Sequence, residues 1–432
     1  MKKQTRIISI IAAALSVAAT AACTAGVQAK EYVPGTPVKV GLICIHNSDS
    51  TYDKNFIDSM GAAVKKLGDR LDGEPIIKTD IPESVDAYNA AKELVKSGCN
   101  LIIADSFGHE PFLLRAAKEW PQVTFCHATG TKAKTEGVKN FHNAFASIYE
   151  GRYLAGYAAG LKLQEMIDAG SLVAKNYDAN QNIKLGYVGA FPYAEVVSGY
   201  TAWYLGVKEV VPNVVMDVTF TGEWYTIEGE KAGAATLAEA GAAIISQHAD
   251  SMGAPGECEK RGIPNITYNI PLADKCPKTY IGYSKIDWAP YYEAVVNAMF
   301  DNKAIEGEVN NNWAGTIGTG SVVYDCVDAE HKAALETVKN ELIAKTRRVF
   351  DCSKFTVKAA KADKSEYSKA SYITMDDDGH LTGYLADVDD DGTYVGETEA
   401  IAQEGGITFF NESAMRSAPY FDIGIDGINK LN

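Results

Sequence analysis

Aromatic and polar side chains recur in this sequence directly after short apolar runs. Tyr52 and Asp53 follow the first run, Phe107 follows another, and Trp224 and Asp250 follow two more. Two aromatic rings can enclose a flat ligand, whereas carboxylates and amides can fix hydroxyl groups or ring nitrogens. The set therefore predicts a site for a neutral, planar, hydroxylated molecule rather than for a phosphate.

Signatures of catalysis are missing from the sequence. It contains no GxSxG motif, no P-loop, no GxGxxG after an apolar run and no HExxH motif. Histidine, aspartate and serine stand together in residues 247–251, but a catalytic triad depends on geometry rather than on adjacency. We therefore expect a binding protein that uses no cofactor. The enzymatic alternative is an exported hydrolase with Asp53 or Asp250 as its general base, and the family resemblance described below would make it a nucleoside hydrolase.

Metal binding is also not expected. Asp387 to Asp391 have the spacing of the first half of an EF-hand loop, and Gly392 stands at the turn position. Thr398 occupies the place of the bidentate glutamate, so an acidic surface turn is favoured. The cysteines and histidines lack the spacing of a zinc site.

Composition and charge exclude several classes of protein. The 432 residues are enough for two or more domains, and the 46% apolar content is that of a globular protein. A net charge of −15 without a basic tract argues against binding to nucleic acid or to an anionic membrane surface.

The first 22 residues have the pattern of an export signal. Three basic residues precede an apolar, alanine-rich stretch that is too short for a stable membrane span. Cleavage before Cys23 would leave a cysteine that carries lipid, and cleavage after Ala29 would be that of an ordinary signal peptidase. We favour lipidation of Cys23 and expect a protein anchored on the extracytoplasmic face of the cell membrane.

Export permits disulfide bonds, and four further cysteines lie in polar, loop-like surroundings. We predict the bridges Cys258–Cys276 and Cys326–Cys352. The other three cysteines lie in or beside apolar runs and are expected in the core, namely Cys44, Cys99 and Cys126.

Strand-like runs alternate with helical patterns up to about residue 301, which predicts βαβ units and parallel sheets. Nine such runs exceed one comfortable sheet, so two lobes are expected. The runs are Val38–Ile45, Ile76–Lys78, Leu101–Ala104, Val123–His127, Ile183–Val188, Val214–Phe220, Ala243–Gln247, Asn265–Asn269 and Thr279–Ser284.

The predicted break between the lobes falls near Asn140–Phe145, where the first series of runs ends. The end of the chain is polar but keeps aromatic residues, so we expect it to pack on the body. The predicted organisation is a signal peptide over 1–22, a tether over 23–37, a first lobe over 38–142 and about 285–312, a second lobe over 143–284 and about 313–350, and an extension over 351–432.

Motifs within residues 38–320 are similar to those of the basic membrane protein family, a family of substrate-binding lipoproteins that serve ABC transporters. Asp53-Lys54-Asn55-Phe56 resembles the family's DKxF loop, and residues 150–156 resemble its EGxYLAG helix. Further matches stand in the family's order at residues 191–196, 222–224, 247–251 and 288–292.

The resemblance implies an α/β, two-lobed type I periplasmic-binding-protein fold with a purine nucleoside or purine in its cleft. It gives Asp53 a ligand contact, makes Trp224 an aromatic of the second lobe and places Lys285 after the hinge strand. Ile57 and Asn269 depart from the asparagine and aspartate that the family has there. The candidate ligand-binding residues are Tyr52, Asp53, Phe56, Phe107, His127, Phe191, Trp224, Asp250, Asn269 and Lys285.

We therefore expect a monomeric solute-binding lipoprotein that captures a purine nucleoside or a related small molecule for an ABC permease. An exported sensor of the same fold, which hands its signal to another partner, is the alternative within the class of binding proteins.

Overall fold

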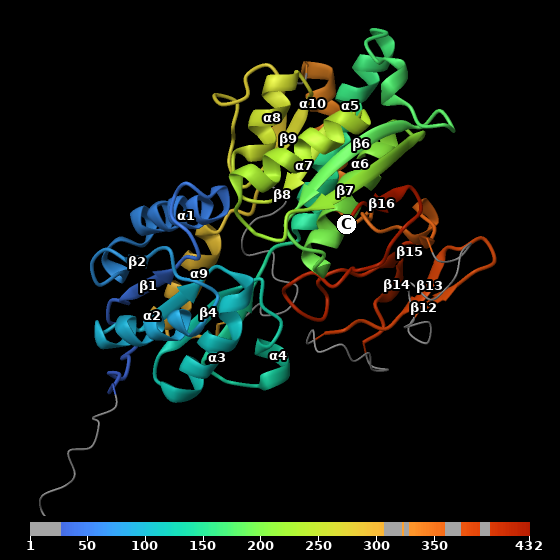
Figure 1. Ribbon diagram of the computed structural model, residues 1–432. Coiled ribbons are helices and arrows are strands. Elements are labelled where there is room, and N and C mark those ends of the chain that lie inside the picture. Colours follow the sequence, from blue (N-terminus) through green and yellow to red (C-terminus); the bar gives the residue numbers. More distant parts are fainter. Residues whose placement is uncertain (1–26, 306–321, 324–327, 359–372, 389–397) are drawn as a thin grey trace, which may run out of the picture.

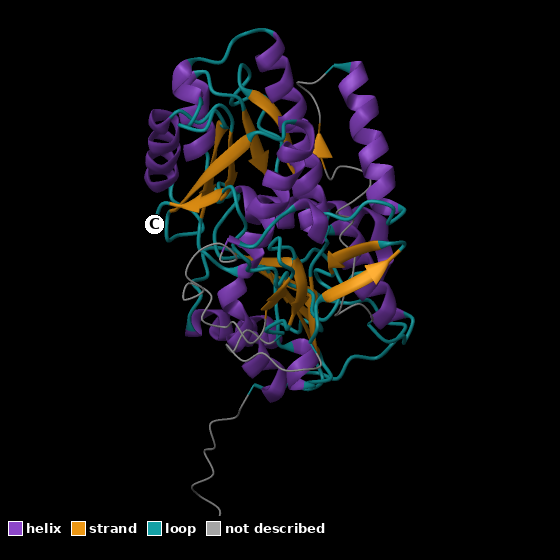
Figure 2. Ribbon diagram, turned by 90° about the vertical axis from the view of Figure 1, so that its right-hand side faces the viewer, coloured by secondary structure: helices purple, strands orange, loops and turns teal. Residues whose placement is uncertain are grey.

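The structure is a computed structural model that describes residues 27–305, 322–323, 328–358, 373–388 and 398–432. Two α/β lobes, each built on a mainly parallel sheet, lie next to each other, and the C-terminal extension lies against them (Figure 1). Figure 2 shows the two sheets one above the other. This arrangement confirms the predicted two-lobed fold. The exact limits of the lobes along the chain stay a prediction.

The first lobe contains a five-stranded parallel sheet in the order β2-β1-β3-β4-β5. Alternate residues of its central strands feed two cores, since Leu101 and Ile103 pack with α1 and α9, and Ile102 packs with α2 and α3. The elements are β1 (Val40–Ile43), β2 (Ile76–Lys78), β3 (Leu101–Ala104), β4 (Thr124–Ala128), β5 (Phe141–Ala144), α1 (Thr51–Leu67), α2 (Val85–Lys96), α3 (Glu110–Glu119), α4 (Ala133–Glu136) and α9 (Ala289–Phe300).

The second lobe contains a seven-stranded sheet in the order β11-β10-β9-β8-β6-β7-β16, which is parallel except at β11. The strands are β6 (Ile183–Gly189), β7 (Val214–Phe220), β8 (Ile245–His248), β9 (Asn265–Tyr268), β10 (Tyr280–Ser284), β11 (Val322–Val323) and β16 (Ile428–Lys430). The helices are α5 (Ile148–Asp168), α6 (Ala194–Val210), α7 (Ile227–Ala240), α8 (Gly253–Arg261) and α10 (Ala329–Ile343).

Two glycines let α5 and α6 pack in close contact beneath the second sheet. A Cβ atom at Gly156 would lie 2.0 Å from the carbonyl oxygen of Trp203, and one at Gly206 would lie 2.1 Å from that of Tyr153. Any larger residue at either position would force the helices apart. The glycine of the YLAG motif therefore has a packing role.

The C-terminal extension is integrated into the second lobe. Its hairpins pair β12 (Ile373–Met375) with β13 (Leu381–Tyr384) and β14 (Ile401–Glu404) with β15 (Ile407–Phe410). Phe421 of the extension stacks on Phe350 with ring centroids 4.3 Å apart, inside the core that also holds α5 and α6. The chain ends in β16, which adds a parallel strand beside β7.

Several strands were absent from the sequence-based prediction, among them β5 and β16 of the two main sheets. The predicted break near Asn140–Phe145 is occupied by β5, whose inner residues His142 and Asn143 are polar but buried. Another missed strand is β16, which has only three residues. Polar or very short strands lack the apolar run on which the prediction relied.

The predicted Cys258–Cys276 bridge is wrong for this structure, in which the two thiols are not joined. Cys258 packs in the apolar core beneath α7 and α8, and the Cys276 thiol donates to the carbonyl oxygen of Leu272 at 3.2 Å. Both side chains are thus buried, although Cys276 lies in the loop between β9 and β10. Cys23 and the Cys326–Cys352 bridge fall outside the described residues, because Cys23 and Cys326 do. Among the described helices, none has the length and apolar character needed to cross a bilayer.

A buried carboxylate fixes the extension to the second lobe. Glu412 Oε2 accepts hydrogen bonds from Ser198 Oγ of α6 at 2.8 Å and from the Phe421 amide at 3.0 Å. Its Oε1 accepts from the Tyr420 amide at 2.6 Å. Burial nevertheless raises the pKa of Glu412 to about 7, against the lowering effect of these donors.

Glu412→Gln should destabilise the protein. The NH2 group that replaces one carboxylate oxygen cannot accept a hydrogen bond, and it would face a donor. We expect a loss of about 1–3 kcal/mol in the free energy of unfolding. Urea titration followed by circular dichroism measures it. The control, Glu404→Gln, changes an exposed carboxylate on β14 that pairs with Arg348, and it should cost less than about 0.5 kcal/mol. Equal losses in the two variants would contradict the anchoring role of Glu412.

Candidate ligand-binding site

A cavity of about 210 Å³ lies between the two lobes. Most of its lining residues follow the carboxyl ends of parallel strands, where open α/β sheets bind their ligands. The first lobe contributes Ile45, Tyr52, Ser106, Phe107 and Thr129; the second contributes Pro192, Tyr193, Ala194, Glu195, Trp224, His248, Asp250 and Tyr268; the extension contributes Asp387, Arg416, Ala418, Pro419 and Asp422.

The lobes touch each other around this cavity. The Thr51 amide, at the start of α1, donates to the carbonyl oxygen of Asp250 at 2.8 Å. Phe107 of the first lobe stacks on Tyr193 of the second with ring centroids 5.4 Å apart. These direct backbone and ring contacts between the lobes show that the cleft is closed.

One wall of the cavity is aromatic. Phe191 stacks on Tyr193 at 5.0 Å and meets the edge of Trp224 at 5.1 Å. Tyr193 and Trp224 line the cavity themselves, and Phe191 supports both from behind. A flat ring can pack on such a surface without a charged partner.

A histidine fixes one carboxylate of the cavity. His248 Nε2 lies 2.8 Å from Glu195 Oε1. Burial lowers the pKa of His248 although Glu195 opposes the shift. The imidazole is therefore neutral near pH 7, and its Nε2–H donates to the carboxylate, which can only accept. Glu195 is held in place and keeps an oxygen for a ligand donor.

Asp250 is the second carboxylate at this end of the cleft. Burial raises its pKa well above the usual range, and the nearby Asp53, Glu230 and Glu195 add to the shift. Asn269 Nδ2 donates to Asp250 Oδ1 at 3.2 Å. Asn269 has a left-handed backbone with φ of 69°, so its place is fixed by the turn after β9, and its amide orients Asp250.

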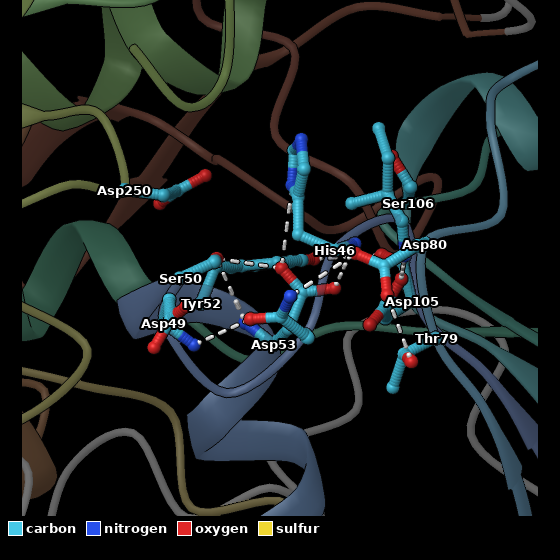
Figure 3. Close-up of polar contacts among 12 residues, drawn as sticks. His46, Asp49, Ser50, Tyr52, Asp53, Thr79, Asp80, Asp105, Ser106 and Asp250 are labelled. Atoms are coloured by element: carbon cyan, nitrogen blue, oxygen red, sulfur yellow. Dashed lines mark hydrogen bonds and ion pairs between the residues drawn. The ribbon is translucent and has the colours of Figure 1, made fainter. Parts of the chain in front are cut away.

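Asp53 has a structural role (Figure 3). Its Oδ1 accepts from the His46 amide at 2.8 Å, and its Oδ2 accepts from Ser50 Oγ at 2.6 Å. Ser50 in turn caps α1 by accepting from the Asp53 amide, as an N-cap serine does. Asp53 is fully buried and does not line the cavity. It shapes the loop that presents Tyr52.

The structure separates the predicted site residues into three groups. Tyr52, Phe107, Trp224 and Asp250 line the cavity. Phe191, Asp53 and Asn269 support residues that do. The remaining three lie outside the lining: Phe56 stacks on Trp288 in the core, His127 contacts the carbonyl oxygen of Ser106, and Lys285 is half-buried beyond β10.

The sequence-based prediction missed the contribution of the extension entirely. Asp387, Arg416 and Asp422 do not follow strands of a parallel sheet, so the strand-end pattern could not select them. It also missed Arg152 of α5, whose guanidinium lies 3.4 Å from the centre of the Tyr268 ring and donates to the carbonyl oxygen of Gln247. Arg152 holds Tyr268 from beneath the cavity.

Cys44, Asp53 and Asp105 form a buried group whose potential ligand atoms lie within 4.8 Å of one another. Both oxygens of Asp53 already accept hydrogen bonds. Burial raises the pKa values of Asp105 and Cys44 well above their usual range, and the charge of Asp53 raises them further. Metal binding requires the deprotonated forms of these ligands, which burial disfavours, so we interpret the group as a structural one. Residues 389–397, within the predicted acidic turn, lie outside the described residues.

Comparison with known proteins gives one clear family. The family model described as ABC transporter substrate-binding protein, PnrA-like, matches residues 41–349. A purine-binding protein of Brucella abortus is 30% identical over 361 residues, which cover 82% of this chain and 93% of that protein. A putative ABC transporter glucose-binding protein of Haloferax volcanii is 25% identical over 252 residues, 58% of each chain.

Solved structures agree on the fold. A solute-binding protein of an ABC transporter system from Conexibacter woesei superposes with a TM-score of 0.54 at 20% identity, covering 72% of this chain and 98% of its own. One from Aeropyrum pernix superposes with a TM-score of 0.52 at 14% identity, covering 80% and 100%.

Glu230 of α7 offers a pH test of how the Asp250 loop is held. Its carboxylate accepts from the Ser251 amide at 3.0 Å, and burial raises its pKa to about 7. Because the pKa is higher in the folded than in the unfolded protein, the folded state holds more protons between about pH 4.5 and 7. The contribution of Glu230 to the free energy of unfolding therefore falls as the pH rises through this window.

Glu230→Gln removes this titration. The difference in unfolding free energy, wild type minus variant, should fall by on the order of 3 kcal/mol between pH 4.5 and 7.5. Urea unfolding at several pH values measures it. Glu228→Gln, an exposed change on the same helix, is the control and should leave the pH profile of the wild type unaltered. A constant difference for Glu230→Gln would show that this carboxyl does not titrate in the window.

Proposed function

The chain belongs to the family of PnrA-like ABC transporter substrate-binding proteins, and we propose that the solute it captures is a purine or a purine nucleoside. The family is one of binding proteins rather than enzymes, so its partners are a small molecule and the components of an ABC transporter. The chain accordingly acts outside the cytoplasm.

The observation that carries the proposal is the pairing of an aromatic wall with carboxylates in a closed cleft. Tyr193 and Trp224 line the cavity with aromatic surface, and Glu195 and Asp250 offer acceptors beside them. Purines carry N–H donors, and ribose adds hydroxyl donors, so both kinds of group suit these acceptors. The Brucella relative, named a purine-binding protein, supports the same ligand class.

Phosphorylated ligands fit this cavity poorly. Its lining includes the carboxylates Glu195, Asp250, Asp387 and Asp422 but a single guanidinium, that of Arg416. Four hydrogen bonds to carbonyl oxygens already occupy that guanidinium. A phosphate would meet like charge without a full set of donors. We infer that nucleosides and bases are preferred over nucleotides.

Capture follows from hinge closure. Binding brings the lobes together and completes contacts such as the Thr51–Asp250 hydrogen bond and the Phe107–Tyr193 stack. The ligand is thereby shielded from water, and the closed form is what a permease would recognise.

A thermal-shift screen tests the ligand class. We expect guanosine, inosine, adenosine or a free purine base to stabilise the protein, with about 2.7 kcal/mol gained at 100 times the dissociation constant. Trp224→Ala should lose most of the shift, and Trp224→Phe should retain part of it because a ring remains. Stabilisation by glucose but by no purine would refute the proposed purine ligand and would favour a sugar, the ligand class in the name of the Haloferax relative.

We also propose that the protein is anchored to the membrane through lipid on Cys23, as the small residues before this cysteine suggest. Cys23→Ser should then shift the protein from the membrane fraction to the soluble extracytoplasmic fraction and leave ligand affinity unchanged. Immunoblotting of fractionated cells measures it. Continued retention in the membrane fraction would refute the lipid anchor.

A further inference from the structure

A segment of the C-terminal extension reaches into the cleft. Residues 411–422, here called the strap, contribute Arg416, Ala418, Pro419 and Asp422 to the cavity lining, and the extension adds Asp387. They form a third wall between the two lobes. The matched family region ends at residue 349, so this wall comes from outside it.

The strap is anchored on the second lobe. Glu412 bonds Ser198 of α6 and the amides of Tyr420 and Phe421. The Tyr420 and Phe421 rings belong to the core that this lobe shares with the extension. Six residues beyond the strap, β16 joins the second sheet beside β7. Buried hydrogen bonds, shared core and strand pairing make the strap part of the second lobe.

The strap also contacts the first lobe, at residues that hydrogen bonds within that lobe hold in position. Ser417 Oγ donates to the carbonyl oxygen of Asn143 at 3.2 Å, and the Ala418 amide donates to the carbonyl oxygen of Gly130 at 3.4 Å. Asn143 Nδ2 donates to Glu110 Oε1 at 3.0 Å. Glu110 also accepts from the Thr131 amide at 2.9 Å. The strap therefore meets a preformed surface of the first lobe through far fewer buried groups than it shares with the second.

Arg416 sets the shape of the strap. Its guanidinium is buried and donates to the carbonyl oxygens of Asp387 at 2.9 Å, Val388 at 3.1 Å and Pro419 at 2.7 Å, while its Nε donates to that of Ala418 at 3.1 Å. These bonds tie residues 387–388 to the strap, which brings two carboxyl side chains to the cavity. The Tyr384 hydroxyl donates to one of them, Asp422 Oδ1, and orients it.

We propose that the strap is a latch and a specificity wall of the binding site. It moves with the second lobe, docks on Asn143 and Gly130 of the first lobe when the cleft closes, and offers Asp422 as an acceptor to a donor group of the ligand. Ligand release then requires the weaker, first-lobe contact to break. The inference rests on the proposed function for the identity of the ligand, but not for the docking of the strap.

Stopped-flow fluorescence and calorimetry on the full chain with guanosine test both parts. Ser417→Ala removes the hydrogen bond to Asn143 and should speed guanosine dissociation about fivefold. Asp422→Asn keeps an acceptor for Tyr384 but loses the charge, and should weaken affinity about five- to tenfold. The matched controls are Ser353→Ala and Asp426→Asn, whose side chains bond Asp351 and Thr356 within the extension, and both should behave as wild type.

Hydrogen exchange of the ligand-free protein tests the latch without any assumption about the ligand, because on this proposal the ligand-free protein also samples the closed cleft in which the strap is docked. Ser417→Ala should raise amide exchange in peptides covering the strap and residues 129–133, and leave peptides covering β16 unchanged. Unaltered exchange and unaltered dissociation would overturn the latch, and wild-type affinity in Asp422→Asn would overturn the specificity wall. Failure of wild-type protein to bind guanosine or any other purine would refute the proposed ligand, while the exchange result would still decide the latch.

Discussion

A parallel sheet places the carboxyl ends of all its strands at one edge, and in this protein the edges of two such sheets face each other. The loops after β1, β3 and β4 therefore meet those after β6, β7, β8 and β9 around a single cavity. This constraint collects side chains from distant parts of the sequence. It also explains why residues that hold the loops, such as Asp53 at the start of α1, matter as much as those that line the cavity.

Burial, more than ion pairing, governs the ionisation of the carboxyl groups in and around the cleft. Burial raises the pKa values of Asp105, Asp250, Glu230 and Glu412, which means that each would be costly as an isolated anion. Backbone amides and polar side chains offset part of this cost. An acceptor-rich site of this kind is completed by a ligand that brings its own N–H and O–H donors, and the aromatic wall supplies the surface for its ring.

Much of the body could be predicted from the sequence, because its central strands are continuous apolar runs. β3 at Leu101–Ala104 and β7 at Val214–Phe220 have the predicted bounds. The lining residues of the extension could not be predicted, since Asp422 reaches the cavity through long-range packing that leaves no periodic pattern. Asp53 shows the opposite limit. The family resemblance matches this residue to a ligand contact, but in the structure its carboxylate accepts hydrogen bonds from the Ser50 hydroxyl and the His46 amide.

We propose that the two lobes and the extension together enclose a purine-type ligand. A crystal structure of the full chain with guanosine tests it most directly. We expect the base to lie against Tyr193 and Trp224, with Glu195, Asp250 and Asp422 within about 3 Å of the donor groups of guanosine. Guanosine bound outside the cleft, or bound within it but out of contact with the strap, would rule out this arrangement.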